Sequence, residues 1–177
     1  MSDYLHRVGD AILHSAYVPA SLRGKLMRRW GYRIAPGSCI WSGASLRSKR
    51  ITFGSEVFVN VGFFYDGADE VTIGNNVRIG QFVRVITATH QIGPSGQRCL
   101  VEAVHKPVRI EDGCWIGSSV TILPGVTIRR GCVIGAGAVV TTSTEPDGLY
   151  LGTPARRARD LPVDGLPLPT DARDMAV

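Results

Sequence analysis

The sequence predicts an all-β protein built as a repeating coil, and three observations carry this prediction. Aliphatic residues recur every six positions over one long stretch, at Ile110, Ile116, Ile122, Ile128, Ile134 and Val140. Small or medium-sized residues follow them by four positions, including Cys114, Val120, Val126, Cys132 and Ala138. Glycines recur just after the aliphatic residue or at the corner, among them Gly117, Gly131 and Gly135. Helices repeat near 3.6 residues and strands at 2, so a period of six indicates short strands joined by tight corners.

Three hexads complete one turn of a triangular prism, so residues eighteen apart are expected to stack, as Ile110 on Ile128. We interpret about five coils, whose residue ranges are 34–50, 51–72, 73–90, 110–127 and 128–145. The hexad phase is lost after His90 and returns at Ile110. This interruption predicts a loop that protrudes from the prism over residues 91–107.

The two ends of the chain differ from the coil. Two apolar stripes broken at Pro19 predict short helices over residues 1–33, which would cap the open end of the coil and hide its core. Residues 161–177 are rich in proline and predict an extended, partly disordered tail. The expected organisation is a helical cap at 1–33, a β-helical region at 34–160 and a tail at 161–177.

The formal net charge of +5 is concentrated near the N-terminus, at Arg7, Arg23, Lys25, Arg28, Arg29 and Arg33. A solvated helix face is one interpretation, and an anionic partner is the other. No nucleic-acid-binding motif accompanies these residues, so we predict no nucleic-acid partner and leave peripheral membrane contact open.

No apolar run is long enough to span a bilayer and no signal peptide opens the chain, which predicts a cytosolic location. The four cysteines show no CxxC spacing, so we expect reduced thiols and no metal.

The candidate catalytic residue is His90, which follows Thr87, Ala88 and Thr89 at the end of the third coil. A histidine at the base of a loop and beside a coil wall is well placed to face a cleft. The alternative is a corner histidine bonded to backbone carbonyls, and spacing alone favours neither. For His105, at the far end of the same loop, we weigh an acid, base or ligand role against a solvated residue and favour the last.

Several motifs in order resemble one family. The segment TATH, followed after a loop by GCWIGSSVTILPGVTI, VIGAGAVVT and GTPARRAR, is similar to the hexapeptide-repeat acyltransferases over roughly residues 30–160. Within that family it looks like the maltose, galactoside, nodulation-factor and exopolysaccharide O-acetyltransferases. The resemblance implies a left-handed parallel β-helix, an exception to the usual right-handed crossover. It also implies acetyl-CoA as co-substrate without a metal, and a homotrimer whose sites lie between neighbouring chains.

The resemblance implies direct transfer of the acyl group to a hydroxyl of a sugar or glycosylated metabolite, with His90 as general base. An imidazole can take the hydroxyl proton near pH 7 and pass it to the departing CoA thiolate. No cysteine occupies a position that would make it a nucleophile, so no acyl-enzyme is expected.

The same resemblance assigns further residues. Asn60 and Asp66 would contact the acceptor, and the backbone N–H of Ser118 would meet the oxyanion. Trp115, Ala136 and Thr141 would lie along CoA, and Arg156 and Arg159 would bind its phosphates, which suits the donor fork of arginine. We expect Arg157 to be solvated. Asp66 is displaced by a residue or two from the acidic positions of the family, and Gln91 stands where many relatives have proline, so the identity of the acceptor is not carried over.

Other functions stay open. An amine acceptor on an amino sugar would make the protein an N-acetyltransferase, and a hydroxyl of an antibiotic would make it an antibiotic acetyltransferase. A noncatalytic β-helical scaffold is a further alternative. A hexapeptide-coil carbonic anhydrase would need three histidines for Zn²⁺, whereas only His90 and His105 lie in the coils or their loop.

Overall fold

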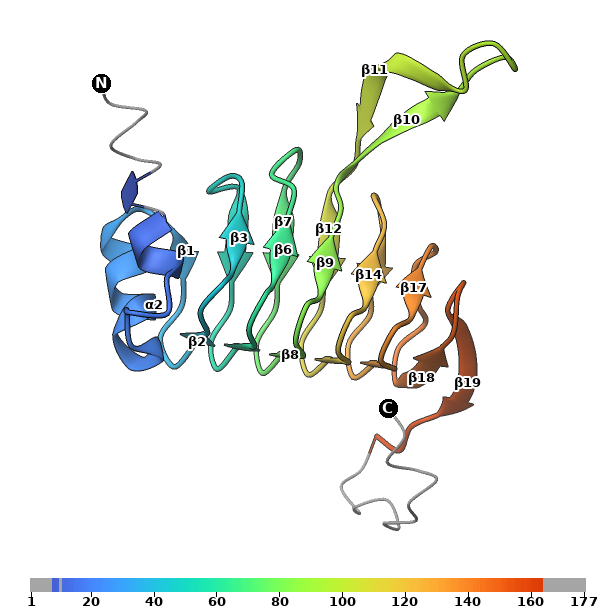
Figure 1. Ribbon diagram of the computed structural model, residues 1–177. Coiled ribbons are helices and arrows are strands. Elements are labelled where there is room, and N and C mark those ends of the chain that lie inside the picture. Colours follow the sequence, from blue (N-terminus) through green and yellow to red (C-terminus); the bar gives the residue numbers. More distant parts are fainter. Residues whose placement is uncertain (1–7, 10, 164–177) are drawn as a thin grey trace.

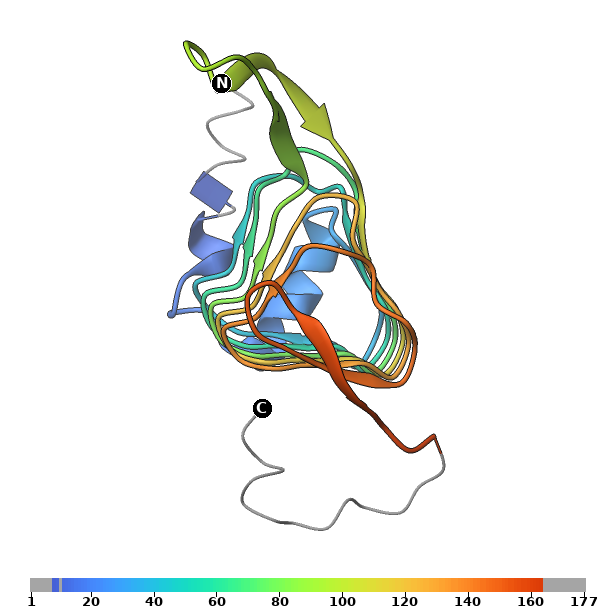
Figure 2. The same ribbon diagram turned by 90° about the vertical axis from the view of Figure 1, so that its right-hand side faces the viewer.

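The computed structural model describes residues 8, 9 and 11–163, which form a stack of coils with a helical cap at one end (Figure 1). Three sheets make the walls of the prism, as the end-on view in Figure 2 shows. Sheet A contains β1 (Arg33–Ile34), β4 (Ile51–Phe53), β7 (Val71–Ile73), β12 (Val108–Ile110) and β15 (Thr127–Ile128). Sheet C contains β3 (Ser45–Leu46), β6 (Phe64–Tyr65), β9 (Arg84–Val85), β14 (Thr121–Ile122) and β17 (Val139–Val140).

Sheet B is the longest wall. It contains β2 (Cys39–Ile40), β5 (Phe58–Val59), β8 (Arg78–Ile79), β13 (Trp115–Ile116), β16 (Val133–Ile134), β18 (Gly148–Leu151) and β19 (Arg156–Asp160). All neighbours within the three walls pair in parallel except β18 and β19, which are antiparallel. The predicted parallel β-helix is therefore confirmed, whereas its left-handed sense stays a prediction.

The hexad pattern explains the core. Most coil strands contain two residues, of which the first faces outward and the second, usually isoleucine or valine, faces the interior. Ile110 pairs with Ile128 as predicted, and both side chains are fully buried. Cys114 and Cys132 are also buried, which confirms their core-facing register. Small side chains fit at these positions because neighbouring walls converge there.

The spacing of the hexads along the sequence is irregular because one corner of the prism varies in length. Between sheet C and sheet A the chain makes connections of different length, of which residues 86–107 form the longest. Ile51 pairs with Val71, twenty residues away, because residues 66–70 enlarge this corner in one coil. Insertions are tolerated here because corner residues take no part in the wall ladders.

The segment expected to be a loop over 91–107 is instead a β-hairpin. Strands β10 (Ala88–Ile92) and β11 (Cys99–His105) pair in antiparallel fashion and project from the prism (Figures 1 and 2). Backbone groups that leave the wall ladder need new partners, and antiparallel pairing supplies them. His90 consequently lies within a strand of the hairpin, opposite Ala103.

The N-terminal cap consists of helical residues 8–9 and 11–14 and helix α2 (Ala20–Arg29). Arg23 of α2 is buried, and its guanidinium donates to the carbonyls of Leu13 at 2.7 Å, Ser15 at 2.7 Å, Ile40 at 2.8 Å and Val18. Burial lowers the pKa of Arg23 below its ordinary value. The solvated-face interpretation is thus wrong for Arg23, although its neighbours Lys25, Arg28 and Arg29 are exposed.

The C-terminal end is closed by Arg157, which was expected to be solvated. Its guanidinium donates to Glu145 O, Pro146 O, Asp147 O, the Tyr150 hydroxyl and the Asp160 carboxylate. These hydrogen bonds, with Tyr150 first and Asp160 second, raise the pKa of Arg157. Arg157 is exposed, as expected, but the sequence did not indicate that it ties β19 to the last corner of the coil.

The predicted tail lies mostly outside the described residues, which end at Val163. In the described part of the chain we find no helix with the length and hydropathy that crossing a membrane requires. The cytosolic location stays a prediction.

We predict that Arg23→Met destabilises the protein by about 3 kcal/mol, because four buried or partly buried carbonyls lose a charged donor. Urea unfolding followed by circular dichroism measures the change. Arg28→Met is the matched control, since Arg28 is an exposed arginine of the same helix and should shift stability by less than about 0.5 kcal/mol. Equal stability of the two variants would contradict the structural role of Arg23.

Candidate active site

A groove of about 320 Å³ runs over the outer face of sheet B and the corner that follows it. The outward residues Phe58, Arg78 and Trp115 stand in register on β5, β8 and β13. We call this the sheet B groove, and its lining includes Phe58, Asn60, Arg78, Gln81, Trp115 and Ser118. Of the residues predicted from the sequence, the structure thus brings together Asn60, Trp115 and Ser118.

Ser118 lies at the corner after β13, where successive coils approach very closely. Its hydroxyl donates to Gln81 Oε1 at 2.6 Å, and within the described chain its backbone N–H donates to no protein acceptor. A Cβ on the preceding Gly117 would lie 2.6 Å from the backbone nitrogen of Ala136, so only glycine fits there. An N–H without a protein acceptor at this corner is a candidate donor to an oxyanion.

His90 is exposed on β10, and its Nδ1 lies 2.6 Å from the carbonyl oxygen of Leu100 on β11. A carbonyl only accepts hydrogen bonds, so Nδ1 must carry the proton. In the neutral ring Nε2 is then the acceptor, which is the tautomer that a general base needs. A bond between the ring and a backbone carbonyl was expected of the structural alternative, and the same bond would also orient the ring as a general base.

Asp66 anchors the root of the hairpin. Its carboxylate accepts from Thr87 N at 2.8 Å, Ala88 N at 3.1 Å, Ala68 N at 3.3 Å and the Thr87 hydroxyl. Thr87 is fully buried and its hydroxyl also accepts from Asp69 N at 2.8 Å. The structure therefore places Asp66 where β10 leaves the prism, away from the residues that line the sheet B groove, and gives it a positioning task that the sequence did not indicate.

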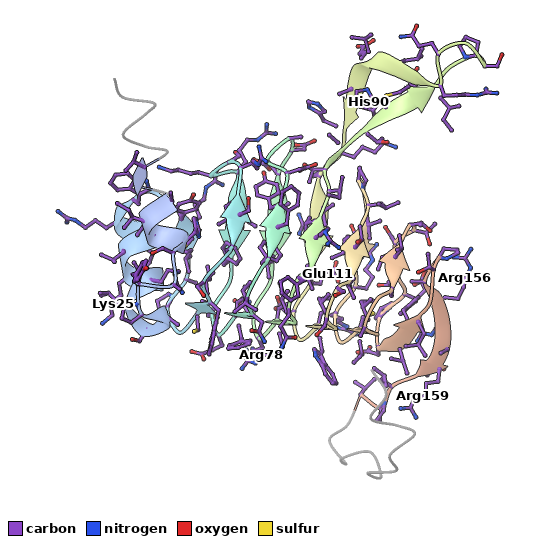
Figure 3. All side chains as sticks on the ribbon, in the orientation of Figure 1. Lys25, Arg78, His90, Glu111, Arg156 and Arg159 are labelled. Carbon is purple, nitrogen blue, oxygen red and sulfur yellow. The ribbon has the colours of Figure 1, made fainter. Side chains whose placement is uncertain are left out.

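His90 and the sheet B groove lie on opposite sides of one chain. Figure 3 labels His90 on the projecting hairpin and Arg78 at the far edge of the prism. The hairpin carries His90 away from its own coil wall, so His90 does not line the sheet B groove of the same chain. Within one chain, His90 and the residues that line the sheet B groove therefore do not form a common site.

The remaining predicted residues lie in the C-terminal coils. Ala136 is exposed at the corner stacked on Gly117, and so continues the edge of the groove. Arg156 is exposed and Arg159 half-buried on β19, at the far edge of sheet B (Figure 3). Thr141 is exposed but follows β17, at the opposite end of sheet C from the groove corner.

The cysteines differ in environment. Burial raises the pKa of the Cys114 thiol to about 12, so it is protonated at neutral pH. Cys99 is exposed on the hairpin and Cys39 is half-buried. Among the residues that the structure describes, no group of three or more His, Cys, Asp or Glu side chains is arranged to hold a metal ion.

Sequence reasoning did not select Arg78, Phe58 or Gln81. The hexad pattern places Phe58 and Arg78 outward, on the same wall as Trp115, and that shared register was the available signal. It was not sufficient because every coil strand has an outward residue, and only the structure shows which of them line a groove.

The coils, their hexad-spaced core and the groove define a hexapeptide-repeat protein. The sequence profile of the family described as "Hexapeptide repeat of succinyl-transferase" matches residues 107–142. Over 118 residues the chain is 32% identical to a galactoside O-acetyltransferase of Lactococcus lactis, a match that covers 67% of this chain and 56% of that protein. The chain spans 53% to 60% of the length of the curated relatives that it matches.

Solved structures extend the comparison over most of the chain. A hexapeptide-repeat-containing acetyltransferase of Vibrio cholerae, solved with acetyl coenzyme A, is 32% identical with a TM-score of 0.77 and matches 90% of this chain and 88% of its own. A maltose O-acetyltransferase of Clostridium difficile is 26% identical with a TM-score of 0.77, over 90% and 86%. The chain belongs to the hexapeptide-repeat acetyltransferase family, as the sequence motifs indicated.

We predict that Asp66→Ala loosens the root of the hairpin, because Thr87 and Ala88 lose hydrogen bonds to a charged acceptor. Amide hydrogen exchange over residues 87–105 should accelerate at least about tenfold, which corresponds to roughly 1.4 kcal/mol. Glu102→Ala removes an exposed carboxylate from β11 and should leave exchange unchanged. Unaltered exchange in the Asp66 variant would show that the hairpin is held by other contacts.

Proposed function

We propose that the protein transfers an acetyl group from acetyl-CoA directly to a hydroxyl of a sugar or glycosylated metabolite, with His90 as general base. The observation that carries the proposal is the hydrogen bond from His90 Nδ1 to Leu100 O, which leaves Nε2 to accept a proton. Family membership supports the reaction class, and relatives named as galactoside and maltose O-acetyltransferases support a sugar hydroxyl as acceptor.

The proposed chemistry follows from the reactants. A hydroxyl attacks a thioester poorly unless its proton leaves as the new C–O bond forms, and His90 Nε2 takes that proton. The negative charge that develops on the thioester oxygen meets the N–H of Ser118. Collapse of the tetrahedral intermediate breaks the C–S bond, and the imidazolium returns its proton to the departing CoA thiolate. No thiol of the protein is acylated, and the protonated, buried Cys114 is consistent with this route.

We further propose that each site combines His90 of one chain with the sheet B groove of another. The separation of the two in a single chain supports this, as do Ile92 and Val101, which are 85% and 87% exposed on the hairpin. Apolar side chains on a projecting hairpin favour contact with a second copy. A cyclic homotrimer, as the sequence motifs suggested, makes every such site equivalent.

On the donor side, we propose that CoA extends along the edge of sheet B from Ser118 past Ala136, with Arg156 and Arg159 toward its phosphates. The order of strands supports this direction, because β16, β18 and β19 follow β13 in sheet B. Arginine forms strong paired hydrogen bonds to phosphate oxygens. Trp115 stands 46% exposed beside this path. Thr141 is the weakest of these assignments because it lies on another wall.

We predict that His90→Ala lowers kcat by about a hundred- to ten-thousand-fold, the usual range for loss of a general base. Release of the CoA thiol in the presence of sugar acceptors measures the rate. His105→Ala is the matched control, since it removes an exposed histidine from the partner strand of the same hairpin and should change kcat less than about threefold. A His90 variant that retains the parent rate to within threefold would remove the base assignment.

We predict that two defective variants restore each other when assembled together. His90→Ala lacks the base and Asn60→Ala damages the groove, so co-expressed chains should form intact sites at roughly one position in four by random mixing. Thiol release by the purified mixture, compared with each variant alone, measures this recovery. Recovery no greater than the sum of the separate variants would place His90 and Asn60 of one site in the same chain.

A further inference from the structure

We infer that the acceptor carries a negatively charged group, a phosphate or a carboxylate, and that Arg78 is the residue that binds it. This inference rests on the proposed function and narrows the class of sugar that the site takes. It follows from the position of Arg78 in the groove, from its lack of an acidic partner and from the order of residues along sheet B.

Arg78 is the charged side chain in the lining of the sheet B groove. Strand register places it directly between Phe58 and Trp115, with neighbouring strands about 4.8 Å apart. Phe58 and Trp115 offer apolar ring surface on either side, against which the carbon–hydrogen faces of a sugar can pack. A sugar held there would have its polar substituents within reach of the guanidinium.

No carboxylate of the described residues forms an ion pair with Arg78. The ion pairs among the described residues join Arg50 to Asp69, Arg129 to Glu111 and Arg157 to Asp160, and none of them includes Arg78. Its Nη1 donates to the carbonyl of Glu56, which fixes part of the side chain but leaves the positive charge without a carboxylate. An exposed arginine with one nitrogen anchored to backbone keeps its other donors for a ligand.

The order of strands assigns Arg78 to the acceptor rather than to CoA. Sheet B runs from β19 through β18, β16 and β13 to β8, so Arg78 lies four strands, or about 19 Å, from Arg156 and Arg159. Ser118, which would meet the thioester, lies between them, beside β13. If the arginines of β19 bind the CoA phosphates, Arg78 lies on the other side of the reacting bond. A cation in that position selects an anionic acceptor over a neutral one.

The experiment measures binding of three probes to the purified protein in the presence of CoA: glucose, glucuronic acid and glucose 1-phosphate. Saturation-transfer NMR titrations give each affinity, and thiol release gives the kinetic constants. We expect at least one anionic probe to bind the parent protein about ten- to a hundredfold more tightly than glucose. The Arg78→Gln variant should lose this difference in affinity. Arg78→Lys should retain part of it, because lysine keeps the charge but not the fork of donors.

Arg84→Gln is the matched control, because Arg84 is an exposed arginine of the same coil on the neighbouring wall and does not line the groove. Its affinities should equal those of the parent. The two anionic probes distinguish a carboxylate from a phosphate as the group recognised.

Three results would overturn the inference: a parent protein that binds neither anion more tightly than glucose, an Arg78→Gln variant that keeps the preference, or an Arg78→Gln variant whose main defect is a raised KM for acetyl-CoA. Failure of the proposed function is a different result, namely no thiol release with any acceptor. In that case the binding preference for anions and its loss in Arg78→Gln still decide the role of Arg78.

Discussion

The whole structure depends on the register between successive coils. A strand of two residues has no stability of its own, and its backbone groups are satisfied only by the coils before and after it. Each two-residue strand contributes one buried side chain, so the core is a column of isoleucine, valine and small residues that supports one register and excludes a slip by a single position. A fixed register also fixes the outward residues, which is why Phe58, Arg78 and Trp115 form a continuous row.

The corner between sheet C and sheet A is where this constraint is relaxed. Extra residues there cost little, because they leave the wall ladders intact. The same freedom would let a projecting hairpin swing, and precise placement of His90 then requires an anchor at its root. The Asp66 carboxylate, bonded to the backbone of residues 68, 87 and 88, supplies that anchor. The proposed base is thus held by two fixed points, Asp66 at the root and Leu100 O beside the ring.

Much of the coil was predictable from the sequence because its signal is local and repeated. The hexads identified the inward column, and Cys114 and Cys132 were placed correctly from spacing alone. Loss of the hexad phase located the projecting segment but carried no information on its internal structure, so the hairpin was missed. The structural roles of Arg23 and Arg157 were missed for a different reason. Their carbonyl partners come from segments that only the fold brings together, and an arginine that ties such segments looks the same in sequence as one in solvent.

The shape of a triangular prism explains why the proposed site needs more than one chain. Flat walls that meet at convex corners leave only shallow grooves, and a thioester in such a groove stays in contact with water on one side. Reaction through a developing oxyanion gains most from surroundings that exclude water and carry fixed donors. A wall of the prism cannot exclude water from its own groove, whereas a hairpin that projects from the corner of a second prism can lie over that groove. In the proposed site the base is on the projecting element, and the N–H of Ser118 and the charge of Arg78 are on the rigid wall that this element would cover.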